Sequence, residues 1–334
     1  PDSVTYLGER AFDNCLALTE VKLSKATPEI LDWTFGNCTS LTSVTIPEGV
    51  TEIGTGAFAY CEKLASVEFP NSLVNIVPDA FYGCNALTEV ELPDSVEYIS
   101  GAFSNCKNLA RISVGEKNNH FKVDRKGVLY TKDGETLVFY PAARDGSYTV
   151  ADGTSRIDEW AFYGRAGLKE VVLPQSLRFI GGEAFAECLA LKTVAIPSGV
   201  EFIGRSAFSG CTALRGIYFH GDAPEDGGYI IADETVTVYY LKGKEGWTSP
   251  TWEGLPSAAF KCFEDVLHTE FYYWPVLWAT EQGITAGTDK DHFSPGMDCT
   301  RGQIVTFLWR AAGCPEPEGT GAPFRDVSKK AYYY

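Results

Sequence analysis

Histidine and cysteine are the side chains of this sequence that could bind a metal or act as nucleophiles. The four histidines are scattered along the chain: His120, His220, His268 and His292. They form no His-x-x-x-His pair, and the ten cysteines form no Cys-x-x-Cys pair, although zinc sites depend on such close spacing. Neither a phosphate-binding loop nor a nucleophile elbow is present. The sequence therefore predicts no catalytic residue, no metal site and no cofactor.

The segment Asp289-Lys290-Asp291 resembles the beginning of a calcium loop. The remaining oxygen ligands and the closing glutamate of such a loop are missing, so we expect an ordinary loop here. The net charge of −16 argues against nucleic acid as a partner, because phosphates would be repelled. No apolar run reaches the length of about 18 residues that a membrane-spanning helix needs, so we expect no membrane insertion.

The cysteines are spaced like a structural repeat. Seven of them follow intervals of 23, 23, 23 and 22 residues and then, after a break, 23 again: Cys15, Cys38, Cys61, Cys84, Cys106, Cys188 and Cys211. We therefore expect one inward column of buried, unreactive thiols. Metal or redox roles are the alternative. A disulfide between neighbouring coils would be short enough, but parallel side chains give it poor geometry.

The apolar residues around these cysteines repeat with the same period. An Ala-Phe pair, once Thr-Phe, recurs eight times, and the stretch Leu-x-x-Val-x-Ile/Leu/Phe returns in each coil, usually followed by Pro. Alternation in this stretch predicts a short strand, which the proline ends because it lacks a donor. A unit of 23 residues cannot bury its own apolar face. We therefore expect eight stacked coils with parallel strands.

One coil shows the motif in full: Leu41-x-x-Val44-x-Ile46-Pro47, then Ile53-Gly54-x-x-Ala57-Phe58-x-x-Cys61. The motif resembles the bacterial surface leucine-rich repeats of the BspA and Treponema type, and the resemblance covers residues 1–250. It implies a repeat solenoid, with a parallel β stack and a short helical or irregular convex side. It also implies exposure on the cell surface and adhesion to a host or bacterial protein, without catalysis.

The strand positions predict which side chains face outward. If Val44 and Ile46 point inward, the residues on either side of Val44 point outward, and the same two columns form an exposed face in every coil. Five members of these columns are predicted to bind protein: Glu68, Glu89, Glu91, Glu170 and Tyr218. The alternative is a solvated sheet face. Aromatic anchors are scarce in these columns, which favours weak or multivalent contacts with basic or polar partners.

The period breaks after Cys106, and residues 115–147 form an insertion. Asp133-Gly134 lies between two stretches of β-forming residues and predicts a hairpin, because this dipeptide adopts the positive φ angles of a tight turn. Two roles stay open: a decorated coil that keeps the stack continuous, or a protruding recognition loop. Residues 215–255, where the pattern decays, are expected to cap the last coil.

A second domain with helix signals follows. A first helix is predicted from about Trp274 or Pro275 to Glu281. A second is predicted to begin at Thr300, because Thr300 and Gln303 have the spacing of a Thr-x-x-Gln capping box.

Four motifs of this domain occur in order: Phe263-Glu264-Asp265-Val266, Gly283-Ile284-Thr285-Ala286-Gly287, Phe293-Ser294-Pro295 and Thr300-Arg301-Gly302-Gln303. Together they resemble one α-helical S-layer-homology (SLH) module over residues 260–315. A second module is predicted to start at residues 322–334, with Phe324-Arg325-Asp326-Val327. The resemblance implies non-covalent binding to a secondary cell-wall polysaccharide, often one with an acidic pyruvyl group.

The SLH resemblance predicts the polymer-binding residues: Arg301, Thr300, Asp265, Gly287 and Trp274. Arg301 matches the arginine of the family's Thr-Arg-Ala-Glu motif, whereas the next two positions depart from it and lose one charge. A guanidinium suits a carboxylate because it donates two parallel hydrogen bonds, although an ordinary exposed arginine is the alternative. Trp278 and Trp309, like Trp274, could stack on sugars, but their helical spacing is more typical of a core.

The two resemblances together predict a non-catalytic protein of a bacterial surface. The solenoid would bind a host or bacterial protein, and the SLH modules would hold it at the cell wall or S-layer, with a signal peptide expected upstream. Two alternatives stay open: a structural component of the surface layer, or the targeting part of a larger surface enzyme.

Overall fold

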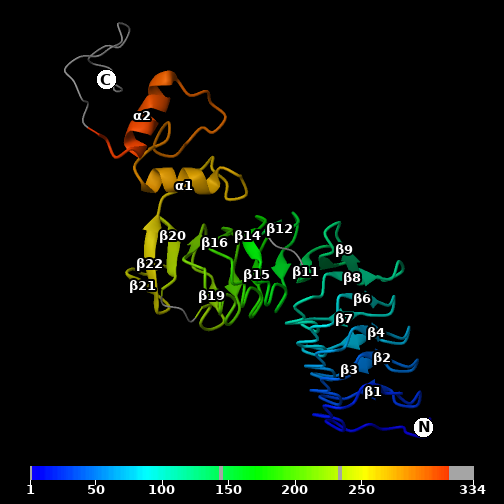
Figure 1. Cartoon of the computed structure of the whole chain (residues 1–334). Coiled ribbons are helices and arrows are strands. Elements are labelled where there is room, and N and C mark those ends of the chain that lie inside the picture. Colours follow the sequence, from blue (N-terminus) through cyan, green and yellow to red (C-terminus); the bar gives the residue numbers. More distant parts are fainter. Residues whose placement is uncertain (1, 143–145, 232–234, 316–334) are drawn as a thin grey trace, which may run out of the picture. The chain divides into compact units, whose positions relative to one another are not determined.

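The computed structural model describes residues 2–142, 146–231 and 235–315. Internal contacts divide the chain into two compact units, Pro1–Ala259 and Phe260–Tyr334. The first unit is a solenoid of coils with short strands, and the described part of the second contains two helices (Figure 1). The S-layer-like segment predicted at residues 322–334 lies outside the described residues.

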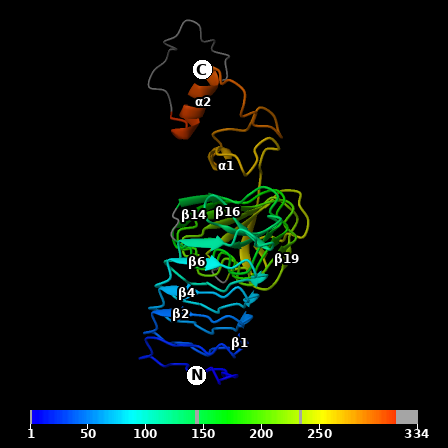
Figure 2. The same ribbon diagram turned by 90° about the vertical axis from the view of Figure 1, so that its right-hand side faces the viewer.

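Seven of the predicted strand stretches, together with Gly146–Thr149 at the end of the insertion, form a first column of strands. Its members are β2 (Ser43–Thr45), β4 (Ser66–Glu68), β6 (Glu89–Leu92), β8 (Arg111–Val114), β12 (Gly146–Thr149), β14 (Leu168–Val172), β16 (Thr193–Ile196) and β18 (Gly216–Phe219). β2 and β4 are parallel, with Val44 opposite Val67. The predicted parallel stacking is confirmed, and Figure 2 shows β2, β4 and β6 one above the other.

A second column, which the sequence analysis did not predict, consists of two-residue strands. Its members are β1 (Glu29–Ile30), β3 (Glu52–Ile53), β5 (Asn75–Ile76), β7 (Tyr98–Ile99), β13 (Arg156–Ile157), β15 (Phe179–Ile180), β17 (Phe202–Ile203) and β19 (Glu225–Asp226). Ile30 lies opposite Ile53 in a parallel pair, and both side chains are buried. Most coils therefore contribute two strands to the core, but the predicted strand stretch at residues 18–23 of the first coil forms no strand.

The rest of each coil is irregular. Hydrogen-bonded turns connect the strands, as where the Cys61 N–H donates to the Phe58 carbonyl at 3.2 Å. The phenylalanines of the Ala-Phe pairs stack from coil to coil, and the ring centroids of Phe58 lie 5.3 Å from those of Phe35 and Phe81. The described residues of the first unit contain no helix, so turns replace the helical segments that the fold class allowed.

The insertion is part of the stack. It contains β9 (Phe121–Val123), β10 (Leu129–Thr131) and β11 (Thr136–Phe139). β10 and β11 form an antiparallel hairpin, in which Gly134 has a φ of 90°. β9 pairs with β10, and β11 pairs in parallel with β13. The hairpin thus extends the second column of the following coils.

Two clusters of buried side chains form the core of the solenoid, and both include residues of the insertion. One extends from Ile30 to Phe139, and the other from Val128 to Leu255. Three further strands follow β18: β20 (Thr237–Leu241), β21 (Thr251–Trp252) and β22 (Leu255–Phe260). They join the sheet of β16 and β18, and the Trp247 ring lies 4.8 Å from that of Phe219.

The second unit contains α1 (Tyr273–Glu281) and α2 (Arg301–Ala311). Both lie where the sequence predicts helices. Thr300 is the N-cap of α2: its side chain accepts from the Gln303 N–H at 3.2 Å, and Gln303 accepts from the Thr300 N–H at 2.8 Å. The predicted capping box is therefore confirmed.

Candidate functional site

Three of the five residues predicted on the strand face lie together. Glu68 on β4 and Glu89 and Glu91 on β6 are exposed, whereas Val90 between the last two is 4% exposed, as strand alternation requires. β4 and β6 belong to different hydrogen-bonded strand pairs but are in contact with each other, so the three carboxylates form one acidic patch. The Thr45 hydroxyl donates to Glu68 Oε2 at 3.0 Å from the preceding coil.

Glu170 and Tyr218 lie outside this acidic patch, beyond the insertion. Both are half-buried, and the Tyr218 ring stacks on that of Tyr239 with centroids 4.5 Å apart. At neighbouring outward positions Ala195 is 6% exposed and Gly216 is buried. The face is therefore not exposed along its whole length, and the five residues do not form one site.

A groove that the sequence analysis missed borders the insertion. Its cavity of about 570 Å³ is lined by β8 with its flanking residues and by β9 with the loop after it. Six lining side chains carry charge: Arg111, Glu116, Lys122, Asp124, Arg125 and Lys132. Four of these are cationic, in a chain whose net charge is −16. The available sequence signal was the lost period after Cys106, which marks where one coil is not followed by another of the same kind.

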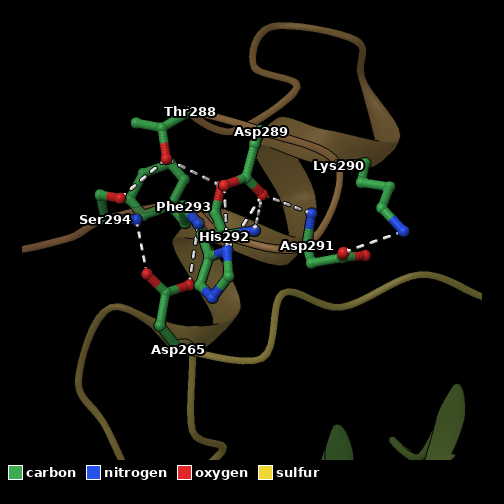
Figure 3. A network of polar contacts seen from close by, with 8 residues as sticks. All are labelled: Asp265, Thr288, Asp289, Lys290, Asp291, His292, Phe293 and Ser294. Carbon is green, nitrogen blue, oxygen red and sulfur yellow. Dashed lines mark hydrogen bonds and ion pairs between the residues drawn. The ribbon is translucent and has the colours of Figure 1, made fainter.

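In the second unit, Asp265 shapes a loop and is not presented as a free carboxylate. Its two oxygens accept hydrogen bonds from the Phe293 and Ser294 N–H groups at 2.8 and 2.7 Å (Figure 3). Partial desolvation opposes ionisation, but the two N–H donors outweigh it and lower the pKa of Asp265 below its ordinary value. Asp265 thus holds together two segments that are distant in the sequence.

Asp289 also organises this loop (Figure 3). Its carboxylate accepts from the Asp291 and His292 N–H groups, both at 2.8 Å, and lies 3.0 Å from His292 Nδ1. The Asp291 N–H and the His292 side chain lower the pKa of Asp289, and the Asp289 carboxylate raises that of His292. This is the ordinary loop that the sequence predicts, with its carboxylate used internally.

The remaining predicted polymer-binding residues have different surroundings. Arg301 is exposed in the first turn of α2, directly after Thr300. Gly287 has a φ of 80°, and an added Cβ would clash with the His292 carbonyl and the Phe263 ring, so its place in the fold requires glycine. Trp274 is half-buried, with its ring 4.7 Å from that of Tyr273.

Two tryptophans of this unit depart from expectation. Trp278 is 56% exposed and Trp309 is 46% exposed, so the prediction that their helical spacing places them in a core is wrong. For Trp309 the reason is that α2 has a broad apolar face, shared with Ile304, Val305 and Leu308, and all four side chains are exposed. Spacing on one helix does not reveal whether a second element covers it.

Residues 2–142, 146–231 and 235–315 contain no group of metal ligands and no membrane-spanning helix. Within them, no three or more His, Cys, Asp or Glu side chains are grouped so as to hold a metal ion. None of the helices that the structure describes is long and apolar enough to cross a bilayer.

A model of the BspA-type leucine-rich repeat region matches this chain in six copies, over residues 1–124 and 138–235. Among solved structures, the chain is similar to a leucine-rich cell surface protein from Faecalibacterium prausnitzii, with 27% identity and a TM-score of 0.56. That match covers 81% of this chain and 71% of the other. A comparison with curated proteins gave no match.

Two further solved structures share the fold. A leucine-rich repeat protein from Eubacterium ventriosum has 23% identity and a TM-score of 0.58, and the match covers 73% of each chain. The pneumococcal vaccine antigen PcpA has 21% identity and a TM-score of 0.51, covering 71% of this chain and 72% of that one. Since the repeat model matches more than half of the residues, the chain belongs to the BspA-type leucine-rich repeat family.

Proposed function

We propose that this chain is a non-catalytic protein of a bacterial surface, and that its solenoid binds another protein. Membership of a leucine-rich repeat family supports a binding role, because repeat solenoids offer extended surfaces to partners. The similar protein from Faecalibacterium prausnitzii is named a cell surface protein, which supports the location.

The observation that carries this proposal is the acidic patch of Glu68, Glu89 and Glu91. The three carboxylates are exposed on a rigid stack of strands, and charged side chains held by a scaffold attract partners of opposite charge. Arg111 lies beside Glu89 in the next strand and limits the patch on that side. We therefore expect a basic partner surface and, without aromatic anchors, modest affinity for each contact.

The test is a charge reversal with a matched control. Glu91→Lys places a positive charge in the acidic patch, whereas Glu62→Lys makes the same change at an exposed position outside the strand face. Surface plasmon resonance against immobilised host-matrix and bacterial surface proteins should show binding that only Glu91→Lys weakens, by about tenfold. Equal effects of the two variants, or no binding by the unchanged chain, would reject the acidic patch as the site.

A second proposal concerns the unit after Ala259, which we infer to be an SLH module that attaches the protein to cell-wall polysaccharide. The supporting observation is Arg301, an exposed guanidinium in the first turn of a capped helix, where an acidic sugar could accept two hydrogen bonds and gain from the helix dipole. Such modules usually act in threes, and the broad apolar face of α2 suits packing against further modules.

Sedimentation with purified native cell walls tests this attachment, using a protein that carries three complete modules. Arg301→Ala should reduce the fraction bound, whereas Lys290→Ala, which removes a cation from the exposed loop, should not. Walls treated to remove the polysaccharide should bind neither protein. If Arg301→Ala sediments like the unchanged protein, Arg301 is an ordinary exposed arginine.

The competing roles predict different outcomes in the same assays. A pure coat component would bind walls but no immobilised protein. If the chain is the targeting part of a larger enzyme, the complete gene product should contain a catalytic domain.

A further inference from the structure

The insertion groove lies along one edge of a strand. Every residue from Ala110 to Glu116 lines it, although a surface that met only one face of β8 would contact alternate residues. A continuous run of lining residues therefore means that the groove follows the backbone of β8.

Within the described residues, no strand forms a hydrogen-bonded ladder with this edge of β8, although β9 lies close to it. β8 belongs to a two-stranded sheet with β6, and the next strand of the first column, β12, pairs with β14 instead. In an uninterrupted coil the Ile46 N–H donates to the Glu68 carbonyl of the coil that follows, at 2.9 Å. Val114 has the same position in its repeat, and no described strand follows it there.

The hydrogen bonds between β8 and β6 show which backbone N–H groups of β8 do not point toward β6. The N–H groups of Arg111 and Gly115 donate to the Thr88 and Leu92 carbonyls, at 3.3 and 2.9 Å. In a parallel ladder successive residues alternate between the two sides. Ile112 and Val114 therefore direct their N–H groups toward the groove, spaced as one face of an added strand requires.

The charge of the groove is opposite to that of the chain. Asp124 is engaged locally, because its Oδ1 accepts from the Lys126 and Val128 N–H groups at 2.7 and 2.9 Å and its Oδ2 from the Tyr148 hydroxyl at 3.1 Å. Within the described residues, Arg111 and Arg125 form no ion pair. The groove thus combines an unpaired strand edge with two available guanidinium groups.

We propose that the edge of β8 binds an extended, acidic peptide segment of a partner protein as an additional strand. Main-chain hydrogen bonds to Ile112 and Val114 would provide the pairing, and carboxylates of the segment would meet Arg111 and Arg125. This site is separate from the acidic patch and selects the opposite charge, so either can fail without the other.

A peptide-binding assay with the full chain tests the pairing and the charge separately. The probe is a fluorescein-labelled eight-residue peptide of alternating threonine and glutamate. Fluorescence anisotropy should show that it binds at least about tenfold more tightly than the same peptide with lysine in place of glutamate. N-methylation of alternate peptide bonds should abolish binding, because it removes the pairing donors while the protein stays unchanged.

Two protein variants complete the test. Arg111→Glu with Arg125→Glu should weaken binding of the glutamate peptide by about tenfold or more, whereas Arg205→Glu, at an exposed position outside the groove, should not. Equal binding of the methylated peptide would reject strand addition, and equal binding of the lysine peptide would reject the acidic partner. Concentration-dependent dimers that Val114→Pro dissolves would identify the occupant as a second copy of the chain and overturn the proposal.

Discussion

The cysteines at the same position of successive coils form hydrogen bonds that link one coil to the next. In six coils the thiol donates to the phenylalanine carbonyl of a preceding coil, as from Cys61 to Phe35 at 3.2 Å. Burial raises the pKa of the Cys61 and Cys106 thiols to about 12, so they stay protonated and keep their donor. The expectation of buried thiols is therefore confirmed for these six, which also link the coils by hydrogen bonds, whereas Cys15 in the first coil is half-buried.

Thiol labelling should separate the cysteines by position. Thiolates are the reactive form, so in the native chain near pH 8 we expect rapid reaction with Ellman's reagent only at Cys299 and Cys314, which are exposed. The six bonded thiols of the solenoid should react only on unfolding. Replacing Cys299 and Cys314 by serine should remove the rapid phase, and its persistence would show that solenoid coils open readily.

Arg165 is the exception in the cysteine column. It lies three residues after Phe162, where other coils have cysteine, and it is 1% exposed. None of its three side-chain nitrogens has a hydrogen-bond partner among the described residues, although the guanidinium lies 5.0 Å from the Phe139 ring centroid. Burial lowers the pKa of Arg165 to about 10, the direction expected when a charge loses its water.

Replacing this arginine should stabilise the solenoid. A buried charge without a partner costs several kcal/mol, more than the roughly 2 kcal/mol of a cation–π contact, and methionine can fill the same long space. We expect Arg165→Met to raise the melting temperature measured by circular dichroism, and the exposed-site control Arg205→Met to leave it unchanged. A lower melting temperature for Arg165→Met would mean that the guanidinium holds a group that the fold requires.

Among the elements, the loop held by Asp265 offers the clearest dependence on pH. Its carboxylate has a lowered pKa, so its contribution to stability is present above the ordinary pKa, about 3.9, and is lost as pH falls through the lowered value. Asp265→Asn should reduce the hydrogen-exchange protection of the Phe293 and Ser294 N–H groups at pH 7, whereas Glu264→Gln should not. Unchanged protection in Asp265→Asn would show that the backbone alone holds the loop.

The sequence predicted correctly those features that depend on residues close together in the chain or on a pattern repeated in many coils. The capping box of Thr300 and Gln303 was predicted because both partners lie within one turn. The first strand column was predicted because its period repeats in many coils. The second column escaped because Glu52–Ile53 is only two residues long, too short for alternation to show, and its partners lie in neighbouring coils.

At the scale of the whole molecule, the insertion determines which first-column strands pair with one another, and the sequence alone does not predict this pairing. Among the described residues, no strand pairs with the edge of β8 that faces away from β6, and Glu170 lies apart from the acidic patch, because β8 and β12 do not pair. The loss of period after Cys106 locates this interruption. It does not say which strand is left without a neighbour, since that depends on how the hairpin pairs with coils on either side.

The same interruption should divide the solenoid into two regions of stability. Coils contact mainly their neighbours, and the buried side chains form separate clusters on the two sides of the insertion. Phe58 and Phe185 are matched positions, one in each cluster, and both are fully buried. Phe58→Ala, at a cost of about 3–5 kcal/mol, should accelerate amide hydrogen exchange in residues 30–112 and leave residues 150–230 protected.

Phe185→Ala should do the reverse, and hydrogen exchange followed by mass spectrometry can measure both variants in peptides from each side. The insertion shares side chains with both clusters, so its own exchange should rise in either variant. Acceleration over the whole solenoid in both would mean that the interrupted column still transmits unfolding and that the coils form one cooperative unit. Acceleration confined to the substituted coil would place the boundary of cooperativity at the single repeat instead of at the insertion.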